Sequence, residues 1–214
     1  YMSRQKLQRF AELATFKNVA QFNQADAKNK LKDFLDGNQE IILELACGKG
    51  DYSLALAKKY PNKKIIGVDI QGERIWYGAG QALDKKLDNL FFLRMQIESL
   101  EEFFTKHSIS EIWITFPDPF PRERQIKKRL SSPRFLNIYK NILIANGLIH
   151  LKTDDLNLFD YSIITIKNNK GEIIEEIRNI YKQKKLKEIL KTKTDFEKKH
   201  LKAGRSIHYL KFKL

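Results

Sequence analysis

The sequence contains very little cysteine and lacks long apolar runs. Its 214 residues include a single cysteine, Cys47, so no disulfide can form within the chain. A lone cysteine favours a reducing compartment, and we expect the cytoplasm. No apolar run approaches the roughly 20 residues that a membrane helix requires, and the first residues lack a signal-peptide core. These absences argue against a membrane protein and against a disulfide-stapled secreted domain.

Acidic residues are also scarce relative to basic ones: 26 Asp and Glu face 40 Lys and Arg, a net charge of +14. The excess is clustered, with net charges of +5 in residues 1–32, +5 in residues 122–134 and +10 in residues 178–214. The remainder is slightly acidic. A basic surface kept for solubility would be charged more evenly. Because neutralised phosphates release counterions and so favour association, the clustering predicts a nucleic-acid partner.

Short apolar runs alternate with amphipathic stretches, which is typical of βαβ units and a parallel sheet. The length and the 42% hydrophobic content fit one main globular domain. The predicted strands are Ile41–Ala46, Lys64–Asp69, Leu90–Met95, Glu111–Thr115 and Leu148–Lys152. The predicted helices are Tyr52–Lys59, Glu73–Lys86, Ile97–Lys106, Ser132–Leu143 and Leu156–Asn168.

The two ends of the chain are less regular. Residues 1–38 are polar and basic and are predicted to form an N-terminal arm followed by a helix around Ala25–Leu35, with 39–214 as the main domain. Residues Glu172–Ile180 fit either a strand or a helix, and Lys182–Lys191 is predicted to be helical. Residues Arg205–Leu214 alternate in polarity, which suits a terminal strand.

A glycine turn follows the first predicted strand. Gly48 and Gly50 lie in this turn, with Glu44 still inside the strand. Glycines at a strand-to-helix turn let the backbone approach a ligand and aim N–H groups at it. Asp69 ends the second predicted strand, where an acid can accept hydrogen bonds from both hydroxyls of a ribose. The structural alternative is a tight turn with an acid that caps the next helix.

The acid-x-x-x-Gly-x-Gly spacing of this turn resembles the first motif of S-adenosylmethionine-dependent methyltransferases. Such enzymes usually place Asp or Asn against the adenine amino group at the position of Gln96, whose side-chain carbonyl can also accept that bond. An exposed polar residue at a strand end is the alternative for Gln96. The resemblance implies a Rossmann-like α/β fold: a mostly parallel central sheet with helices on both faces, an antiparallel C-terminal strand, and S-adenosyl-L-methionine as cofactor.

Asp118 lies between Pro117 and Pro119 directly after the fourth predicted strand. Each proline fixes its own φ and pushes the residue before it toward extended geometry, so Phe116 and Asp118 are expected to be extended. Ligands bind at this edge of open α/β sheets. Asp118 is therefore a candidate reactive or recognition group, and capping of the following helix is its structural alternative. The basic segment that follows is predicted to bind phosphate, unless it is merely a solvated loop.

The proline-framed aspartate and the basic segment together resemble the bacterial tRNA (guanine-N7-)-methyltransferases of the TrmB type, with their Pro-Asp-Pro-Trp-Pro-Lys and Arg-His-x-Lys-Arg-Arg motifs. Three later features agree with that family: Lys152-Thr153-Asp154, Thr194-Asp195-Phe196-Glu197 and Gly204. Four positions depart from it, where the family usually has Gly, Trp, Lys and His: Ala46, Phe120, Arg122 and Gln125.

The resemblance implies transfer of the methyl group of S-adenosylmethionine to N7 of a guanosine in the tRNA variable loop, with Asp118 as the catalytic residue. The implied cofactor-binding residues are Glu44, Gly48, Gly50, Asp69, Gln96 and Asp118. The implied substrate-binding residues are Arg122, Asp154, Thr194, Asp195, Phe196 and Glu197. The implied RNA-binding residues are Arg124, Lys127, Lys128 and Arg129.

Structural alternatives remain for part of this set. Asp154 could cap the helix that begins at Leu156, and Thr194 with Glu197 has the spacing of a capping box. Two rival functions also remain: a non-catalytic RNA-binding module on the same fold, and a methyltransferase acting on a different RNA. We expect no metal, because the four histidines lack ligand spacing, and no obligate protein partner.

Overall fold

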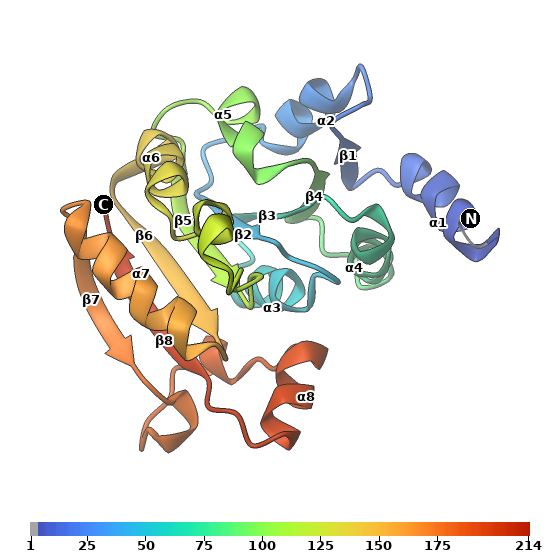
Figure 1. Ribbon diagram of the computed structural model, residues 1–214. Coiled ribbons are helices and arrows are strands. Elements are labelled where there is room, and N and C mark those ends of the chain that lie inside the picture. Colours follow the sequence, from blue (N-terminus) through green and yellow to red (C-terminus); the bar gives the residue numbers. More distant parts are fainter. Residues whose placement is uncertain (1–3) are drawn as a thin grey trace. The chain divides into compact units, whose positions relative to one another are not determined.

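Four parallel strands form the sheet of the first of two compact units in the computed structural model, which describes residues 4–214 (Figure 1). This unit ends at Ser99 and its strands run in the order β1-β4-β3-β2. Residues 1–3 lie outside the described residues. They include the start of the predicted arm and part of the N-terminal stretch that was expected to lack a signal peptide. The elements of this unit are α1 (Arg4–Thr15), β1 (Val19–Gln21), α2 (Ala27–Phe34), β2 (Ile41–Leu45), α3 (Asp51–Lys59), β3 (Lys64–Asp69), α4 (Gly72–Asp84), β4 (Leu90–Arg94) and a 3-10 turn (Ile97–Ser99).

The strands of the first unit form its core. Continuous apolar runs build β2, β3 and β4, and most of their residues are buried, as expected for parallel strands covered on both faces. Each fully buried aliphatic side chain stabilises the fold by about 1.5–3 kcal/mol. Phe92 of β4 has a particular role here, because a Cβ added to Gly50, Gly67 or Gly78 would come within 2.9 Å of its ring. Glycine at these positions lets the loop after β2 and helix α4 pack directly on Phe92.

The second unit runs from Leu100 to Leu214 and has the strand order β5-β6-β8-β7. Strands β5 and β6 are parallel, whereas β8 is antiparallel to both β6 and β7, which confirms the expected antiparallel C-terminal strand. Its helices and strands are α5 (Leu100–Phe103), β5 (Ile109–Thr115), α6 (Pro133–Ile142), β6 (Leu143–Thr153), α7 (Leu156–Asn168), β7 (Glu172–Ile177), α8 (Asp195–Lys202) and β8 (His208–Lys213). Its 3-10 helices are η2 (Glu123–Lys128), η3 (Ile180–Lys182) and η4 (Glu188–Lys191).

All five predicted strands are present, but the structure corrects several other boundaries. Strand β6 begins at Leu143, and its regular pairing with β5 resumes at Leu148 after an irregular segment that includes Asn146 at φ +63°. The predicted helix Ile97–Lys106 is shorter and ends at Phe103. The predicted helix Lys182–Lys191 is wrong, because only its two ends form short 3-10 turns. Tertiary contacts override the helix propensity of its lysines: Ile189 and Leu190 are buried, and the Leu190 carbonyl accepts from the Lys152 ammonium group at 3.2 Å.

The N-terminal segment is more ordered than the predicted arm. Helix α1 and strand β1 were not predicted, and β1 pairs with β4. Arg9 of α1 lies 2.7 Å from Glu73 of α4 and places its guanidinium over the rings of Trp76 and Tyr77. The Trp76 indole N–H donates to Glu12 at 2.9 Å. These contacts hold α1 against α4, so the two aromatic side chains anchor the N-terminal helix.

No helix in the part of the chain that the structure describes combines the length and the apolar character needed to cross a membrane.

Candidate active site

The glycine turn of the first unit has left-handed backbone geometry at three positions: Ala46 (φ +56°), Gly48 (φ +56°) and Gly50 (φ +73°). Gly50 must be glycine because a Cβ there would lie 2.7 Å from the Phe92 ring. A Cβ at Gly48 would meet no atom within 4 Å, so the turn faces open space at this point. Ala46 adopts a conformation that glycine takes without strain, which explains why a glycine is usual there.

Asp69 connects the glycine turn to helix α4. One carboxylate oxygen accepts a hydrogen bond from the Gly48 N–H at 2.9 Å, and the other accepts from the Gln71 N–H at 2.8 Å. The side chain is largely buried, with 8% of the residue exposed. Each carboxylate oxygen can accept a second hydrogen bond. The structure therefore brings Gly48 and Asp69 together and leaves Asp69 able to accept from a ligand.

Glu44 lies beneath the turn rather than at its surface. It is buried in β2, and its carboxylate accepts a hydrogen bond from the hydroxyl of Ser53, which is buried in α3. Burial, with further contributions from Glu44 and Asp69, raises the pKa of the Cys47 thiol well above its usual value. Cys47 is therefore a protonated, inert side chain in this environment.

The chain just before Gln96 is hydrogen-bonded to the backbone of Asp69. The N–H of Met95, the residue before it, donates to the Asp69 carbonyl at 3.1 Å, and the Gln96 residue itself is exposed. The first unit thus places four of the predicted cofactor residues (Gly48, Gly50, Asp69 and Gln96) around one end of its sheet, with Glu44 underneath.

In the second unit, the loop after β5 presents Asp118. Asp118 is exposed and has no hydrogen-bond or ion-pair partner among residues 4–214. The expectation of extended geometry is wrong for Phe116, which precedes a proline but has φ +51°. Its N–H donates to the Lys152 carbonyl at 2.7 Å, and its ring packs against Phe196 with centroids 5.4 Å apart. These tertiary contacts override the local preference and turn the chain sharply where β5 ends.

Arg129 holds the other side of this loop. Its Nε donates to the Pro119 carbonyl at 2.9 Å, its Nη2 donates to the Phe120 carbonyl at 3.2 Å, and its guanidinium lies over the Tyr161 ring. Only 6% of the residue is exposed. The prediction that Arg129 contacts RNA therefore does not fit its position, because its donors are turned inward to loop carbonyls. Arg129 instead positions the segment that carries Asp118.

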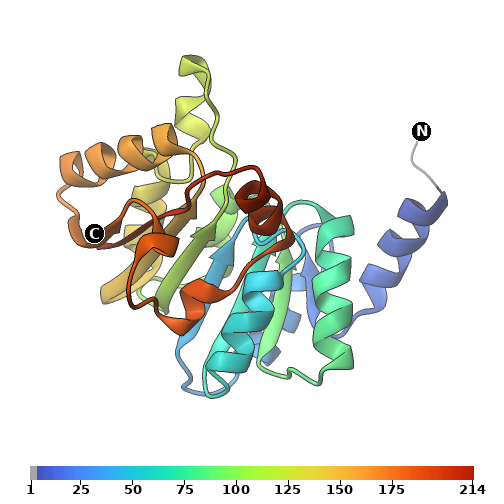
Figure 2. The same cartoon turned by 90° about the horizontal axis from the view of Figure 1, so that it is seen from below.

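The basic strip is the segment Arg122–Arg129, and its other four cations are exposed. Arg122, Arg124, Lys127 and Lys128 all lie at the surface, in or next to η2. Figure 2 shows η2, in yellow-green, projecting from its unit. The strip therefore offers four accessible cations, whereas the sequence alone would have counted Arg129 as a fifth.

Asp154 is not the N-cap of helix α7. That position belongs to Asp155, which accepts from the Leu158 N–H at 2.7 Å. Asp154 instead lies 2.9 Å from Nδ1 of His200 and accepts from Arg205 at 2.7 Å. The capping alternative for Asp154 is thus wrong, and the carboxylate is directed to α8 and the segment after it.

His200 connects two of the predicted substrate residues. Besides its contact with Asp154, its ring stacks on Phe196, with centroids 4.0 Å apart and an interplanar angle of 26°. Phe196 remains 47% exposed and also contacts Phe116, two residues before Asp118. The structure therefore gathers Asp154, Phe196 and the start of the Asp118 loop into one neighbourhood. His200 was not predicted as a site residue, although its place four residues after Phe196 on helix α8 puts the two side chains on the same face.

Thr194 and Glu197 have structural roles in helix α8. Thr194 is the N-cap, and its hydroxyl accepts from the Glu197 N–H at 3.1 Å, which is one half of the capping box. The Glu197 side chain is fully buried, pairs with the Lys152 ammonium at 2.8 Å and accepts from the Tyr181 hydroxyl at 2.7 Å. Asp195, in contrast, is exposed and pairs with Lys198.

Lys152 is buried with Glu197. Its ammonium group also donates to the carbonyls of Leu190 (3.2 Å) and Thr192 (3.0 Å). Burial lowers the pKa of Lys152, and the Glu197 carboxylate opposes this effect. Burial also raises the pKa of Tyr181, as does its hydrogen bond to Glu197. Lys152 and Tyr181 thus both donate to the buried Glu197 carboxylate.

The described residues contain no group of three or more His, Cys, Asp or Glu side chains placed to hold a metal ion.

The chain is similar to known proteins in sequence and in fold. A family model described as "Putative methyltransferase" matches residues 38–210. The chain is 39% identical to the tRNA (guanine-N(7)-)-methyltransferase of Christiangramia forsetii, over 99% of both chains. It is 38% identical to the enzyme of the same name from Bacteroides fragilis, over 100% of this chain and 87% of that one.

Among solved structures, the 16S rRNA methyltransferase KamB matches with a TM-score of 0.67 and 10% identity, over 91% of this chain and 97% of that chain. At this identity the likeness shows the fold alone. The predicted Rossmann-like methyltransferase fold is thereby confirmed.

The strained Ala46 gives a stability prediction. Ala46→Gly should raise the free energy of unfolding by about 0.5–1 kcal/mol, because relief of left-handed geometry outweighs the added chain entropy of glycine. Urea denaturation measures the change. Ala55→Gly, inside helix α3, is the matched control and should lower stability by about 1 kcal/mol. A loss of stability in both variants would contradict the interpretation.

The buried Lys152–Glu197 pair gives a second prediction. Glu197→Ala should cost about 3–5 kcal/mol of unfolding free energy, because it leaves a buried ammonium without its counterion. The double variant K152M/E197L should be much less destabilised, since it removes both charges and keeps apolar volume. A Glu197→Ala cost near zero, or a double variant as unstable as the single one, would show that the pair is not a buried coupled unit.

Proposed function

Because the chain belongs to the tRNA (guanine-N(7)-)-methyltransferase family, we propose that it transfers the methyl group of S-adenosylmethionine to N7 of a guanosine in the tRNA variable loop. The observation that carries the proposal is Asp118: an exposed carboxylate without a partner in the described residues, on a loop clamped by Arg129. A carboxylate that only capped a helix would have its oxygens occupied by backbone N–H groups.

The residues of the first unit fit the cofactor. Gly48 faces open space, and both oxygens of Asp69 keep capacity to accept from ribose hydroxyls. Gln96 is exposed beside Asp69 and can accept from an adenine amino group. Gly50 and the buried Glu44 maintain the turn from below. When bound, S-adenosylmethionine supplies an electrophilic methyl group, and we assign Asp118 to cofactor contact as well as to substrate recognition.

The chemistry of N7 suits a carboxylate that recognises the guanine base. It does not require a carboxylate that removes a proton. N7 has an in-plane lone pair and no proton, so no general base is needed. The two oxygens of Asp118 can accept from N1–H and the exocyclic amine of guanine, a pair of donors that adenine does not offer. Its negative charge also stabilises the positive charge that methylation leaves on the base. Positioning is therefore the main task of these residues.

The second unit supplies the proposed guanosine contacts. Arg122 and Asp195 are exposed, and Phe196 offers a partly exposed ring for stacking. Asp154 lies in the same neighbourhood through His200. Thr194 and Glu197 contribute by holding helix α8, since one caps it and the other is buried. For RNA backbone contact we propose Arg124, Lys127 and Lys128, with the cytoplasm as the compartment that provides the tRNA.

Asp118→Asn tests the proposal. The carboxamide keeps the size of the side chain, but it has one acceptor oxygen instead of two and no negative charge. It therefore pairs poorly with the two guanine donors, and kcat/KM should fall by about 100- to 1000-fold. The assay uses labelled S-adenosylmethionine and unmodified tRNA, followed by nucleoside analysis for 7-methylguanosine. Asp84→Asn, at an exposed aspartate that ends α4, is the control and should be fully active.

Retained turnover in Asp118→Asn would refute the assigned role. A different methylated nucleoside formed by the unaltered protein would indicate another RNA substrate. If calorimetry detects no binding of S-adenosylmethionine, the protein is instead a non-catalytic RNA-binding module.

The basic strip gives a separate prediction. Charge reversal at Lys127 and Lys128 should weaken tRNA binding and lower the slope of log K against log salt by about 2, because two phosphate contacts are lost. Affinity for S-adenosylmethionine should not change. Binding titrations at four or more salt concentrations measure the slope, and an unaltered slope would place the RNA elsewhere.

A further inference from the structure

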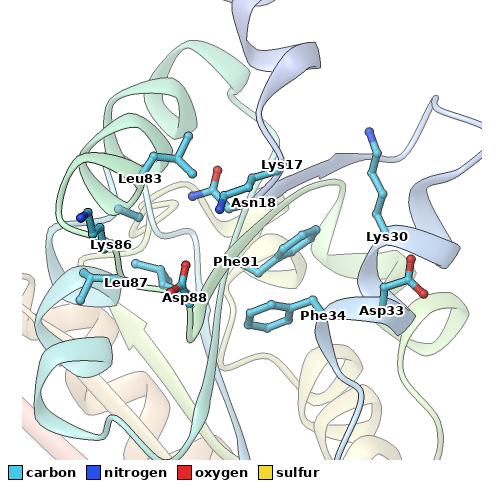
Figure 3. Close-up of a pocket in the computed structure, with 12 residues that line it drawn as sticks. Lys17, Asn18, Lys30, Asp33, Phe34, Leu83, Lys86, Leu87, Asp88 and Phe91 are labelled. Atoms are coloured by element: carbon cyan, nitrogen blue, oxygen red, sulfur yellow. The ribbon is translucent and has the colours of Figure 1, made fainter.

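The first unit carries a basic groove at the end of its sheet away from the glycine turn. The groove consists of two adjoining hollows of about 530 and 550 Å³ that share Lys86, Leu87 and Asp88 in their walls. Figure 3 shows the first hollow, with Lys17, Lys30 and Lys86 around the rings of Phe34 and Phe91. Six lysines line the two hollows (Lys17, Lys30, Lys58, Lys63, Lys64 and Lys86), against two acids (Asp33 and Asp88).

Three of these lysines are already engaged. Lys30 pairs with Asp26 at 3.2 Å, Lys63 pairs with Glu40 at 2.5 Å, and Lys64 lies over the Phe34 ring at 4.7 Å. The other three, Lys17, Lys58 and Lys86, are exposed and have no acidic partner among residues 4–214. The groove therefore presents three lysines without an ion-pair partner from three different parts of the unit: the α1–β1 connection, helix α3 and the end of helix α4.

The groove is distinct from the proposed cofactor site. Lys64 begins strand β3 and Asp69 ends it, so a strand of six residues, about 17 Å long, separates the two ends. In open α/β sheets small ligands bind at the carboxyl ends of the strands, whereas the groove lies at the amino ends. Flexible ammonium groups without a fixed partner suit phosphates spaced along a chain, because each acts as a point charge.

We propose that this groove binds the phosphate backbone of the RNA substrate, as a second contact surface separate from the strip around η2. The proposal rests on the proposed function for the identity of the RNA, which is tRNA. Charge complementarity selects the occupant: three free lysines neutralise about three phosphates, and each neutralised phosphate adds about 0.9 to the salt slope of binding. The contact holds the body of the RNA and takes no part in methyl transfer.

Lys86 permits a sharp experiment because of its backbone. It has φ +51° just after helix α4, where its N–H donates to the Leu83 carbonyl and the Leu87 N–H donates to Ala82. Glycine is the preferred residue at this position of a helix C-terminus. Lys86→Gly therefore removes the cation, relieves the left-handed geometry and should raise the melting temperature.

Lys170 is a matched control in the other unit. It follows helix α7 with φ +62°, its N–H donates to the Lys167 carbonyl, and the Gly171 N–H donates to Ile166. Lys170 is exposed and lines neither hollow. Lys170→Gly thus makes the same change in charge and backbone outside the groove.

Titration of each variant with unmodified tRNA over a range of salt tests the proposal. Lys86→Gly should lower the salt slope by about 0.9 and weaken binding by up to about eightfold at 0.1 M salt, whereas Lys170→Gly should leave both unchanged. The triple variant K17Q/K58Q/K86G should lower the slope by about 2.7. Turnover at saturating tRNA and affinity for S-adenosylmethionine should be unaltered.

Equal effects of Lys86→Gly and Lys170→Gly, or an unchanged slope in the triple variant, would overturn the proposal. An acidic peptide serves as a second ligand. If the triple variant loses binding to this peptide but keeps the salt slope for tRNA, the groove binds acidic protein segments rather than RNA, and the proposal is wrong. Because these titrations measure binding only, they remain decisive if the unaltered protein forms no 7-methylguanosine. Failure of the proposed function and failure of the groove are thereby distinguishable.

Discussion

Burial of Lys152 is the constraint on which the arrangement of the second unit depends. Its carbonyl accepts from Phe116 at the start of the Asp118 loop, and its ammonium group holds Glu197 of helix α8. A buried charge is tolerated only when every partner is in place. Lys152 of β6 therefore contacts the loop that carries Asp118 through its carbonyl and the helix that carries Phe196 through its ammonium group. Helix α8 cannot shift without leaving that charge unpaired.

In the first unit, the glycine turn is held in place without a buried cation. Its turn is held by backbone N–H groups on the Asp69 carboxylate and by glycines packed on Phe92. A carboxylate shared between two loops leaves lone pairs for a ligand, whereas an ion pair such as Lys152–Glu197 uses its donors and acceptors internally. The two units thus differ in a physically sensible way: the part proposed to bind the cofactor keeps hydrogen-bonding capacity, and the part behind the substrate residues provides rigidity.

Local patterns in the sequence predicted most of the strands and the two loops of the site, although the helix over Lys182–Lys191 and the extended geometry of Phe116 were wrong. Apolar runs identified β2 to β5, the glycine spacing identified the turn, and the proline frame identified the Asp118 loop. Features that depend on distant partners were not predictable. Arg129 and Lys128 are adjacent cations in the sequence, yet only Arg129 meets the carbonyls of Pro119 and Phe120. Helix α1 likewise needs Glu73 and the aromatic residues of α4, which are 64 residues away or more.

The net charge of +14 therefore includes basic residues that are buried and basic residues that are exposed, and only the exposed ones can contact RNA. Pairing at the surface lowers the net charge that a phosphate meets, but it costs little to break, because exposed ion pairs contribute only about 0–1 kcal/mol. Lys198 beside Asp195 is still available in this sense. Burial is different, because moving Lys152 or Arg129 to the surface would dismantle the loop and helix that they hold. The basic residues that build the site and those that can attract the RNA are thus separate sets, and burial is the property that distinguishes them.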